Sequence, residues 1–201
     1  MTDHYYSRNP KVESSPTLLT TTLRNESFTF KTDQGVFSKK DIDFGSRLLI
    51  ESFELPTIQG PILDIGCGYG PIGISLAKSY PDRIVHMVDV NERAIGLTKE
   101  NAVVNKVPNT EVYVSDRLEG VAEKEFSAIV TNPPIRAGKR VIYDIFEKSY
   151  DHLADGGYLY IVIQKKQGAP SAKTKLAEVF EGMVETVVKD KGYFVFKVIK
   201  R

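Results

Sequence analysis

The sequence predicts an α/β fold, a doubly wound and mostly parallel seven-stranded sheet that ends in a C-terminal antiparallel β-hairpin. Short apolar segments alternate with amphipathic ones from residue 42 onward, which is typical of strands connected by helices. A glycine-rich turn follows the first apolar segment, at the position where open α/β sheets bind their ligands. The last two apolar segments, 184–190 and 193–200, are separated by a turn too short for a helix, so these two strands must be antiparallel.

The N-terminal 41 residues differ from the rest of the chain. They are polar, with stretches rich in Ser and Thr, and predict an arm with a small strand-and-loop layer rather than a packed core. A helix is expected over 42–53, because apolar residues then recur at helical spacing: Phe44, Leu48, Leu49 and Phe53. We therefore divide the chain into an N-terminal region, 1–41, and a main domain, 42–201.

The elements of the main domain can be followed along the sequence. Apolar runs predict five strands before the hairpin, at 61–65, 84–90, 110–114, 126–132 and 158–164. Helical spacing predicts helices that end at Ser79, begin after Asn91 as N-cap, run from Ile142 to Leu153, and surround Leu176. The glycines of 155–157 are expected to end the third of these helices, because glycine commonly follows a helix C-terminus.

Composition argues against several classes of protein. With 201 residues, 41% hydrophobic and 26% charged, the chain has the balance of one globular domain with a buried core. No apolar run approaches the ~20 residues of a membrane helix, and no secretory signal is visible. The single cysteine, Cys67, rules out internal disulfides and favours a cytoplasmic location. Three scattered histidines give no metal-ligand spacing, so no metal is expected.

Basic residues are unevenly distributed, although the net charge is only +1. Each cluster by itself is best interpreted as solvated surface, but together they allow a basic lip around a site, as a nucleic-acid partner would require. The clusters are Arg136, Lys139 and Arg140, then Lys165 and Lys166, and finally Lys197, Lys200 and Arg201.

The glycine-rich turn spans Asp64-Ile65-Gly66-Cys67-Gly68-Tyr69-Gly70. Glycines let the backbone bend sharply and lie close to a ligand, and free amides at the next helix start favour an anionic group such as a carboxylate. A dinucleotide-binding turn is the alternative interpretation. Its G-x-G-x-x-G spacing differs from the G-x-G-x-G found here, and the hairpin ending also disfavours it.

The next two predicted strands end in acids. Asp89, followed by Val90 and Asn91, can accept hydrogen bonds from both hydroxyls of a ribose. Ser115 and Asp116 end the third strand, where a carboxylate can bind the amino group of an adenine. Each feature alone is an ordinary strand-end turn, but three at successive strand ends predict a pocket for an amino acid joined to adenosine.

The fourth strand stops at Asn132-Pro133-Pro134, next to this pocket. Asn-Pro is a common turn former, so a stiff loop is the simplest interpretation. The placement suggests chemistry instead. An exocyclic amine on a purine is a poor nucleophile, and two acceptors on its N–H bonds leave its lone pair free to react. The Asn132 side-chain oxygen and the Pro133 carbonyl can be these acceptors, with proline restricting their orientation.

These motifs resemble those of class I S-adenosylmethionine-dependent methyltransferases. More narrowly, Gly35-Val36-Phe37-Ser38 with Asp43-Phe44-Gly45-Ser46 and Leu48-Leu49 resembles the RsmC-type ribosomal RNA guanine-N2 methyltransferases. The resemblance covers about residue 12 to the C-terminus and makes 42–201 the catalytic domain. It implies S-adenosylmethionine as cofactor and ribosomal RNA or the small ribosomal subunit as partner, with no membrane association.

The resemblance also implies a role for individual residues. Asn132, Pro133 and Pro134 would be catalytic, and Phe37, Ile135 and Arg136 would contact the target base. The residues that would hold the cofactor are Asp64, Ile65, Gly66, Cys67, Gly68, Asp89, Val90, Asn91, Ser115, Asp116 and Asn132.

Two departures from the family pattern leave alternatives open. The family usually has an aromatic residue where Ile135 stands, and Phe37, Tyr5 or Tyr6 could supply the stacking face instead. RsmC-type enzymes often carry a duplicated, inactive N-terminal half, and this sequence resembles the catalytic half alone. The surface that positions RNA would then come from the arm, the basic lip or a second subunit in a homodimer. Adenine N6, a protein glutamine and a non-catalytic RNA-binding relic remain alternative interpretations, because the motif alone does not choose among them.

Overall fold

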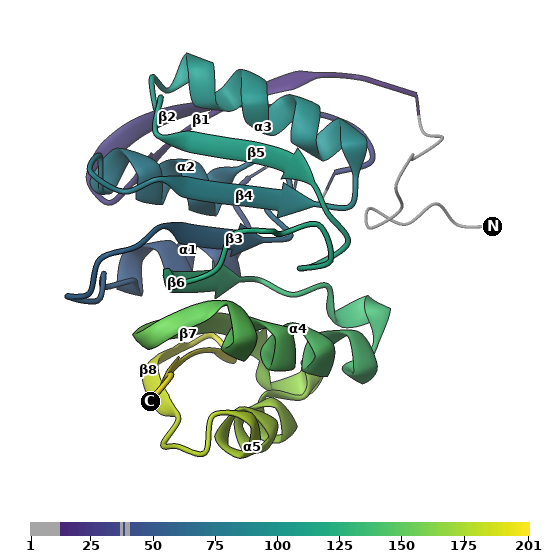
Figure 1. Cartoon of the computed structure of the whole chain (residues 1–201). Helices are drawn as coiled ribbons and strands as arrows, with labels where there is room; N and C mark the ends of the chain where they lie inside the picture. Colours follow the sequence, from purple (N-terminus) through teal and green to yellow (C-terminus); the bar gives the residue numbers. More distant parts are fainter. Residues whose placement is uncertain (1–12, 37, 39–40) are drawn as a thin grey trace.

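The computed structural model describes residues 13–36, 38 and 41–201. Its centre is a seven-stranded sheet with strand order β5-β4-β3-β6-β7-β9-β8. The five parallel strands are β3 (Ile62–Ile65), β4 (Val85–Asp89), β5 (Thr110–Val114), β6 (Phe126–Thr131) and β7 (Leu153–Gln164). Figure 1 shows β5, β4, β3 and β6 stacked with their arrowheads toward one edge, the carboxyl edge, and β7 pairs parallel with β6. The predicted fold class is confirmed.

The C-terminal hairpin consists of β8 (Glu185–Asp190) and β9 (Tyr193–Ile199). β9 pairs antiparallel with β7, and β8 lies at the outer edge of the sheet. The last strand of the chain therefore inserts between β7 and β8, and its end returns to the edge opposite the carboxyl ends of the parallel strands. The turn between β8 and β9 consequently lies at the carboxyl edge, beside the end of β7.

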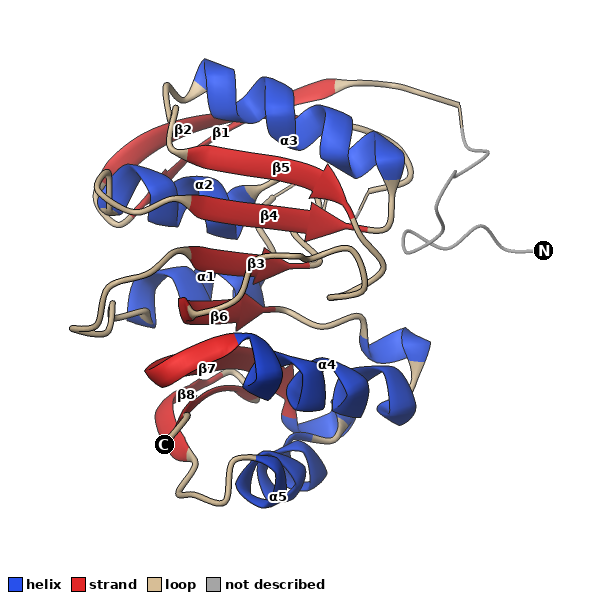
Figure 2. Cartoon of the chain, in the orientation of Figure 1, coloured by secondary structure: helices blue, strands red, loops and turns tan. Residues whose placement is uncertain are grey.

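Helices cover both faces of the sheet (Figure 2). One apolar cluster packs under α1 (Phe44–Ser52), α2 (Pro71–Ser79) and α3 (Glu92–Val104). A second packs under α4 (Lys139–His152) and α5 (Ala169–Val179). Two short 3-10 turns, η1 (Ile135–Ala137) and η2 (Lys165–Gln167), precede α4 and α5. The sheet is thus wound on both sides, and the strand order reverses between β3 and β6, where such sheets bind ligands.

The N-terminal region forms a hairpin of β1 (Thr17–Leu23) and β2 (Glu26–Thr32). The predicted strand layer is confirmed, but the expectation that it lacks a packed core was wrong. Leu23, Phe28 and Phe30 are buried and belong to the cluster under α1, α2 and α3. Asn101 of α3 and Asn105, the C-cap of this helix, dock β2, because each exchanges two hydrogen bonds of 2.7–3.0 Å with the β2 backbone.

The end of α4 is a second correction. The helix ends at His152 and Leu153 is already extended, so the glycines of 155–157 lie inside β7 instead of ending the helix. Leu153 is fully buried and pairs with Phe126, and the register between β6 and β7 shifts before Ala128 pairs with Tyr158. Burial of Leu153 in the sheet therefore fixes the boundary, and the glycines accommodate the irregularity.

Along the parts of the chain that the structure covers, every helix is too short or too polar to span a bilayer.

Candidate functional site

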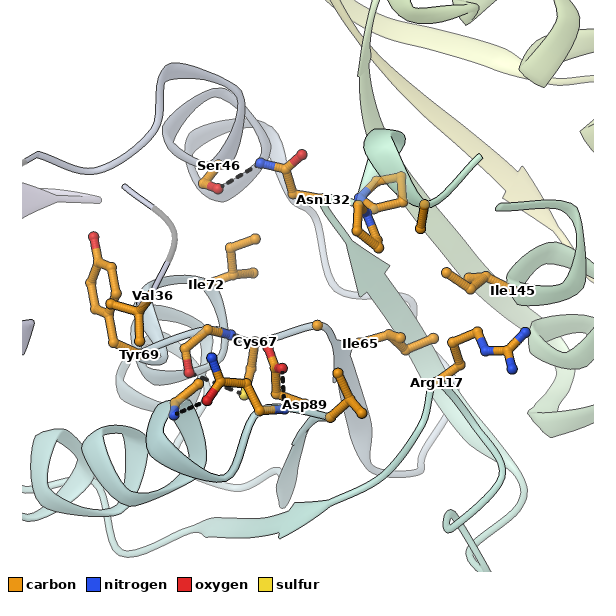
Figure 3. Close-up of a pocket in the computed structure, with 18 of the residues that line it drawn as sticks. Val36, Ser46, Ile65, Cys67, Tyr69, Ile72, Asp89, Arg117, Asn132 and Ile145 are labelled. Atoms are coloured by element: carbon orange, nitrogen blue, oxygen red, sulfur yellow. Dashed lines mark hydrogen bonds between the residues drawn. The ribbon is translucent and has the colours of Figure 1, made fainter. Parts of the chain in front are cut away.

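A cavity of about 320 Å³ opens at the carboxyl edge of the sheet, between the ends of β3, β4 and β6. Two walls face each other across it. The glycine-turn wall comprises Ile65–Gly68, Asp89–Asn91 and Ser115–Asp116. The Asn132 wall comprises Asn132–Pro134 with Asp43 and Ser46. Figure 3 shows Ser46 and Asn132 on one side of the cavity and Cys67 and Asp89 on the other.

The glycine turn owes its shape to backbone conformations that L side chains rarely adopt. Gly66, Gly68 and Gly70 have φ values of 73°, 59° and 96°. A Cβ added at Gly66 or Gly68 would meet no atom within 4 Å, because both residues face the open cavity. These two positions thus form a cradle in which a ligand can lie directly against the backbone.

Asp89 holds this turn in place from the end of β4. One carboxylate oxygen accepts a 2.9 Å hydrogen bond from the Gly68 amide, and the other accepts one of 2.9 Å from the Asn91 amide. Burial raises the pKa of Asp89, and these hydrogen bonds act against that shift. Each carboxylate oxygen has two lone pairs, so both can still accept from a ligand hydroxyl.

Asp64 does not line the cavity. Its side chain is fully buried behind the glycine turn, where one oxygen accepts a 2.9 Å hydrogen bond from the Gly73 amide. The other oxygen has no hydrogen-bond partner among the described residues. Burial raises the pKa of Asp64 to about 7, opposed by the Gly73 hydrogen bond and reinforced by the charge of Asp89. Asp64 shapes the turn, and direct contact with a cofactor stays a prediction.

The third strand end is more open. Asp116 lines the cavity but is largely exposed, and its carboxylate pairs with the neighbouring Arg117 at 2.9 Å. Arg117 also reaches Asp144 of α4 at 2.6 Å. An adenine amino group would therefore share the Asp116 carboxylate with a guanidinium, which the sequence did not indicate.

Asn132 is oriented by the beginning of α1. Its amide nitrogen donates to a carboxylate oxygen of Asp43 and to the hydroxyl of Ser46, both at 2.9 Å. The Asp43 carboxylate can only accept, so the amide nitrogen must point toward it and the Asn132 oxygen away from it. No hydrogen bond to that oxygen occurs among the described residues.

Asp43 also caps the N-terminus of α1. The carboxylate oxygen that accepts from Asn132 also accepts a 3.0 Å hydrogen bond from the Ser46 amide, which makes Asp43 the N-cap of α1. A helix cap is thereby coupled to the loop after β6. Gly45 allows this arrangement, because a Cβ there would lie 2.8 Å from the Tyr193 ring and 3.0 Å from the Asp43 carboxylate.

The proline loop keeps one carbonyl available. The Pro134 carbonyl accepts a 2.8 Å hydrogen bond from the Ala137 amide and so closes η1. The Pro133 carbonyl accepts no hydrogen bond within the described part of the chain. The end of β6 is also tied to β3, because the Thr131 hydroxyl donates to the Ile65 carbonyl at 2.9 Å. The two walls are therefore fixed relative to each other at their base.

Most of the predicted site residues come together. Those that line the cavity are Ile65, Gly66, Cys67, Gly68, Asp89, Val90, Asn91, Ser115, Asp116, Asn132, Pro133 and Pro134. Ile135 does not line it but packs against the core under α4 and α5. Phe37, Tyr5 and Tyr6 lie outside the described residues, and so does the side chain of Arg136.

Sequence reasoning missed two groups of lining residues. Asp43 and Ser46 belong to the stretch that resembles the RsmC-type enzymes, and the Asp-x-x-Ser pattern at the start of α1 is the signal that could have indicated their role. The apolar lining residues Val36, Val141 and Ile145 come from segments far apart in the chain, and none of them was predicted as a site residue.

Comparison with known proteins places the chain in a family. The family model of the methyltransferase small domain matches residues 27–197. The chain is 56% identical to the uncharacterized protein YbxB of Bacillus subtilis (strain 168) over 201 residues, which is 100% of both proteins. It is 42% identical over 132 residues to the ribosomal RNA small subunit methyltransferase C of Aeromonas hydrophila, which covers 64% of this chain and 37% of that protein.

Among solved structures, a 16S rRNA N2 methyltransferase of T. thermophilus (RsmC), in complex with AdoMet and guanosine, has a similar fold. The TM-score is 0.83 at 24% identity, over 96% of this chain and 52% of that one. The chain thus spans about half the length, or less, of these two rRNA methyltransferases. It belongs to the methyltransferase small domain family, and the predicted resemblance to class I methyltransferases of the RsmC type is confirmed.

Proposed function

We propose that this protein transfers a methyl group from S-adenosylmethionine to the exocyclic N2 of a guanine in ribosomal RNA of the small subunit. One observation carries the proposal. The Asn132 amide nitrogen is held by Asp43 and Ser46, which leaves its oxygen free beside an unbonded Pro133 carbonyl. Two acceptors at one edge of a cavity suit a planar amine, which has two N–H bonds to donate.

The glycine-turn wall fits the cofactor. The cradle at Gly66 and Gly68 would take the amino-acid part, and the Asp89 carboxylate would accept from the ribose hydroxyls. Asp116 would bind the adenine amino group in competition with Arg117. When bound, the cofactor supplies an electrophilic methyl group on a cationic sulfur. The carboxylates of this wall favour that positive charge.

The Asn132 wall would act on the acceptor. Hydrogen bonds from N2 to the Asn132 oxygen and the Pro133 carbonyl favour a pyramidal nitrogen, whose lone pair then points toward the methyl group. The Asp43 carboxylate behind Asn132 polarises the amide, which makes its oxygen a stronger acceptor. After transfer, the alkylated N2 is acidic and loses its proton without a strong base. Catalysis therefore rests mainly on alignment and exclusion of water.

The choice of guanine in ribosomal RNA is supported by the relatives. The Aeromonas protein is named a ribosomal RNA small subunit methyltransferase, and the T. thermophilus enzyme was solved with guanosine. A guanine within RNA would have to leave its stack to reach the cavity, which costs a few kcal/mol and is easiest in unpaired regions.

Methyl transfer to different acceptors tests this proposal. The protein is incubated with S-adenosylmethionine labelled in the methyl group and with unmodified small ribosomal subunits, naked ribosomal RNA, DNA or protein. Digestion to nucleosides or amino acids then identifies the product, and Asn132→Ala serves as the inactive control. We expect N2-methylguanosine from subunits or ribosomal RNA. N6-methyladenosine or methylglutamine would overturn the choice of acceptor, and donor binding without any transfer would indicate a non-catalytic relic.

A further inference from the structure

Exposed cations gather at the carboxyl edge of the sheet, around the Asn132 wall. They are Lys139 and Arg140 at the start of α4, Lys165 and Lys166 before α5, and Lys191 in the β8–β9 turn. We infer that these five residues, the basic rim, bind the phosphate backbone of RNA and hold its target base over the cavity. This inference rests on the proposed function and names the surface through which the substrate is recruited.

One side of the basic rim is connected to Asn132 through Phe44 and Asp43. The Lys191 ammonium lies 4.7 Å from the centre of the Phe44 ring, and Phe44 follows Asp43 in the chain. The Lys165 amide donates to the carbonyl of Gly192 at 2.8 Å, which places η2 beside this turn. Lys165, Lys166 and Lys191 therefore flank the end of the cavity where Asn132 is held.

The other side of the basic rim follows Asn132 along the chain. Residues 133–138 lead from the end of β6 through η1 into α4, which begins with Lys139 and Arg140. Because α4 and α5 both follow parallel strands, both helices start at the carboxyl edge of the sheet (Figure 1). The cations thus stand on two sides of the Asn132 wall.

Lys139 and Arg140 stand at the start of α4, and Lys165 and Lys166 shortly precede α5, positions that are unfavourable for cations unless an anion is present. The amide groups at a helix N-terminus carry a partial positive charge, which acids stabilise and cations oppose. α4 and α5 both begin after a glycine, with no side-chain cap and no acid in the first turn. α3, beside the glycine-turn wall, follows the usual rule with Asn91 as cap and Glu92 in its first turn. Unbonded helix amides together with lysines favour phosphate.

The basic rim is also unneutralised within the protein. Among the residues that the structure describes, none of its five cations forms an ion pair, although the exposed Asp190 at the end of β8 directly precedes Lys191. The C-terminal tail behaves differently. Lys197 pairs with Glu185 at 2.6 Å, and Lys200 donates to the Leu153 carbonyl at the opposite edge of the sheet. The predicted basic lip therefore excludes Lys197 and Lys200.

RNA suits this arrangement better than an acidic protein segment. The cations border the cavity proposed to take the target base, and a chain with one phosphate per nucleotide can contact several of them while one base enters. The whole chain has a net charge of only +1, so the attraction is local. The glycine-turn wall carries the carboxylates of Asp89 and Asp116, whereas the Asp43 carboxylate of the Asn132 wall accepts hydrogen bonds from Asn132 and the Ser46 amide. The basic rim therefore attracts a polyanion to the Asn132 wall, where the methyl acceptor is proposed to bind.

Charge reversal tests the inference. The triple variant Lys165→Glu/Lys166→Glu/Lys191→Glu is compared with Lys99→Glu/Lys106→Glu, which reverses two exposed lysines of the α3 region away from the cavity. Both are assayed with ribosomal RNA over a range of salt concentrations and with guanosine, which has no phosphate. RNA binding is also measured directly by fluorescence anisotropy. Donor affinity and thermal melting confirm that the variants are folded.

We expect the rim variant to raise KM for RNA about tenfold or more and to reduce the salt dependence of RNA binding by about two to three phosphate contacts. Its activity on guanosine and its donor affinity should equal those of the wild type, and the Lys99/Lys106 variant should behave as wild type throughout. An unchanged KM for RNA, or an equal change in the control, would overturn the inference. Binding of an acidic protein to the basic rim in place of RNA would also overturn the inference. If wild-type protein methylates neither RNA nor guanosine, the proposed function fails, while anisotropy still decides whether the rim binds RNA.

Discussion

The two walls of the cavity are built in different ways. In the glycine-turn wall, each key contact joins residues of consecutive strand–turn units, such as Gly68 with Asp89 and Asp89 with Asn91. In the Asn132 wall, Asn132 contacts Asp43 and Ser46 across 89 and 86 positions of the chain. The first wall is a local motif that folds with its strands. The second exists only when α1 has docked beside β6.

This difference has a functional meaning. A wall made of backbone amides and glycines suits a constant ligand such as a cofactor. In the Asn132 wall, the amide of Asn132 is oriented by the N-cap of α1. This wall can therefore be altered without disturbing the glycine-turn wall. Substitutions on the two walls should therefore separate cofactor binding from transfer.

The largest effect is expected at Asn132. Asn132→Ala removes one of the two acceptors for the amine, and we expect the transfer rate to fall about 100- to 1000-fold, as with loss of a key hydrogen-bonding group in other active sites. Donor affinity measured by calorimetry should remain unchanged, because the glycine-turn wall is intact. Wild-type turnover in this variant would show that Asn132 does not hold the amine.

Asp43 comes next, as a positioning residue that acts through Asn132. Asp43→Ser keeps a good helix cap but is too short to hold the Asn132 amide as the aspartate does. We expect kcat to fall about 10- to 100-fold with little change in donor affinity. Asp43→Asn retains an acceptor oxygen and should recover part of the activity. Equal kcat for wild type and Asp43→Ser would limit Asp43 to capping α1, and thermal melting reports that contribution separately.

Asp89→Ala should affect the opposite wall. The change removes the proposed acceptor for the ribose and releases the amides of Gly68 and Asn91. We expect donor affinity to weaken about 10- to 100-fold, since each hydrogen bond to a charged group contributes roughly 1.5–3 kcal/mol. Transfer at saturating donor should fall much less. Calorimetry decides the matter, and unchanged affinity would contradict the ribose assignment.

The smallest effect concerns stability and Asp64. Its pKa is about 7 in the folded protein, above the ordinary value of 3.8, because of burial. The folded state therefore binds a proton more tightly than the unfolded state, and this contribution to the free energy of unfolding is lost as pH rises through 7. Asp64→Asn should remove that dependence, so the variant gains stability relative to wild type between pH 5 and 7.5, by a few kcal/mol at most. Urea unfolding of both proteins measures it, and parallel pH profiles would refute the assignment.

The same contrast explains what the sequence could predict. The alternation of strands and helices, the C-terminal hairpin and the glycine-turn residues follow from local patterns, because each of these features lies within a short stretch of the sequence. The orientation of Asn132 by Asp43 depends on tertiary packing, as does the burial of Phe28 and Phe30 in the main core. The glycines of 155–157 were misjudged because sheet pairing of Leu153 overrode a local helix-end signal.

A crystal structure of the protein with guanosine and S-adenosylhomocysteine tests the central claim most directly. The account predicts that N2 of guanosine lies within hydrogen-bond distance of both the Asn132 side-chain oxygen and the Pro133 carbonyl, and that its lone pair points toward the sulfur. A base bound elsewhere, or an Asn132 amide turned so that its nitrogen faces the base and Asp43 has lost its partner, would contradict it.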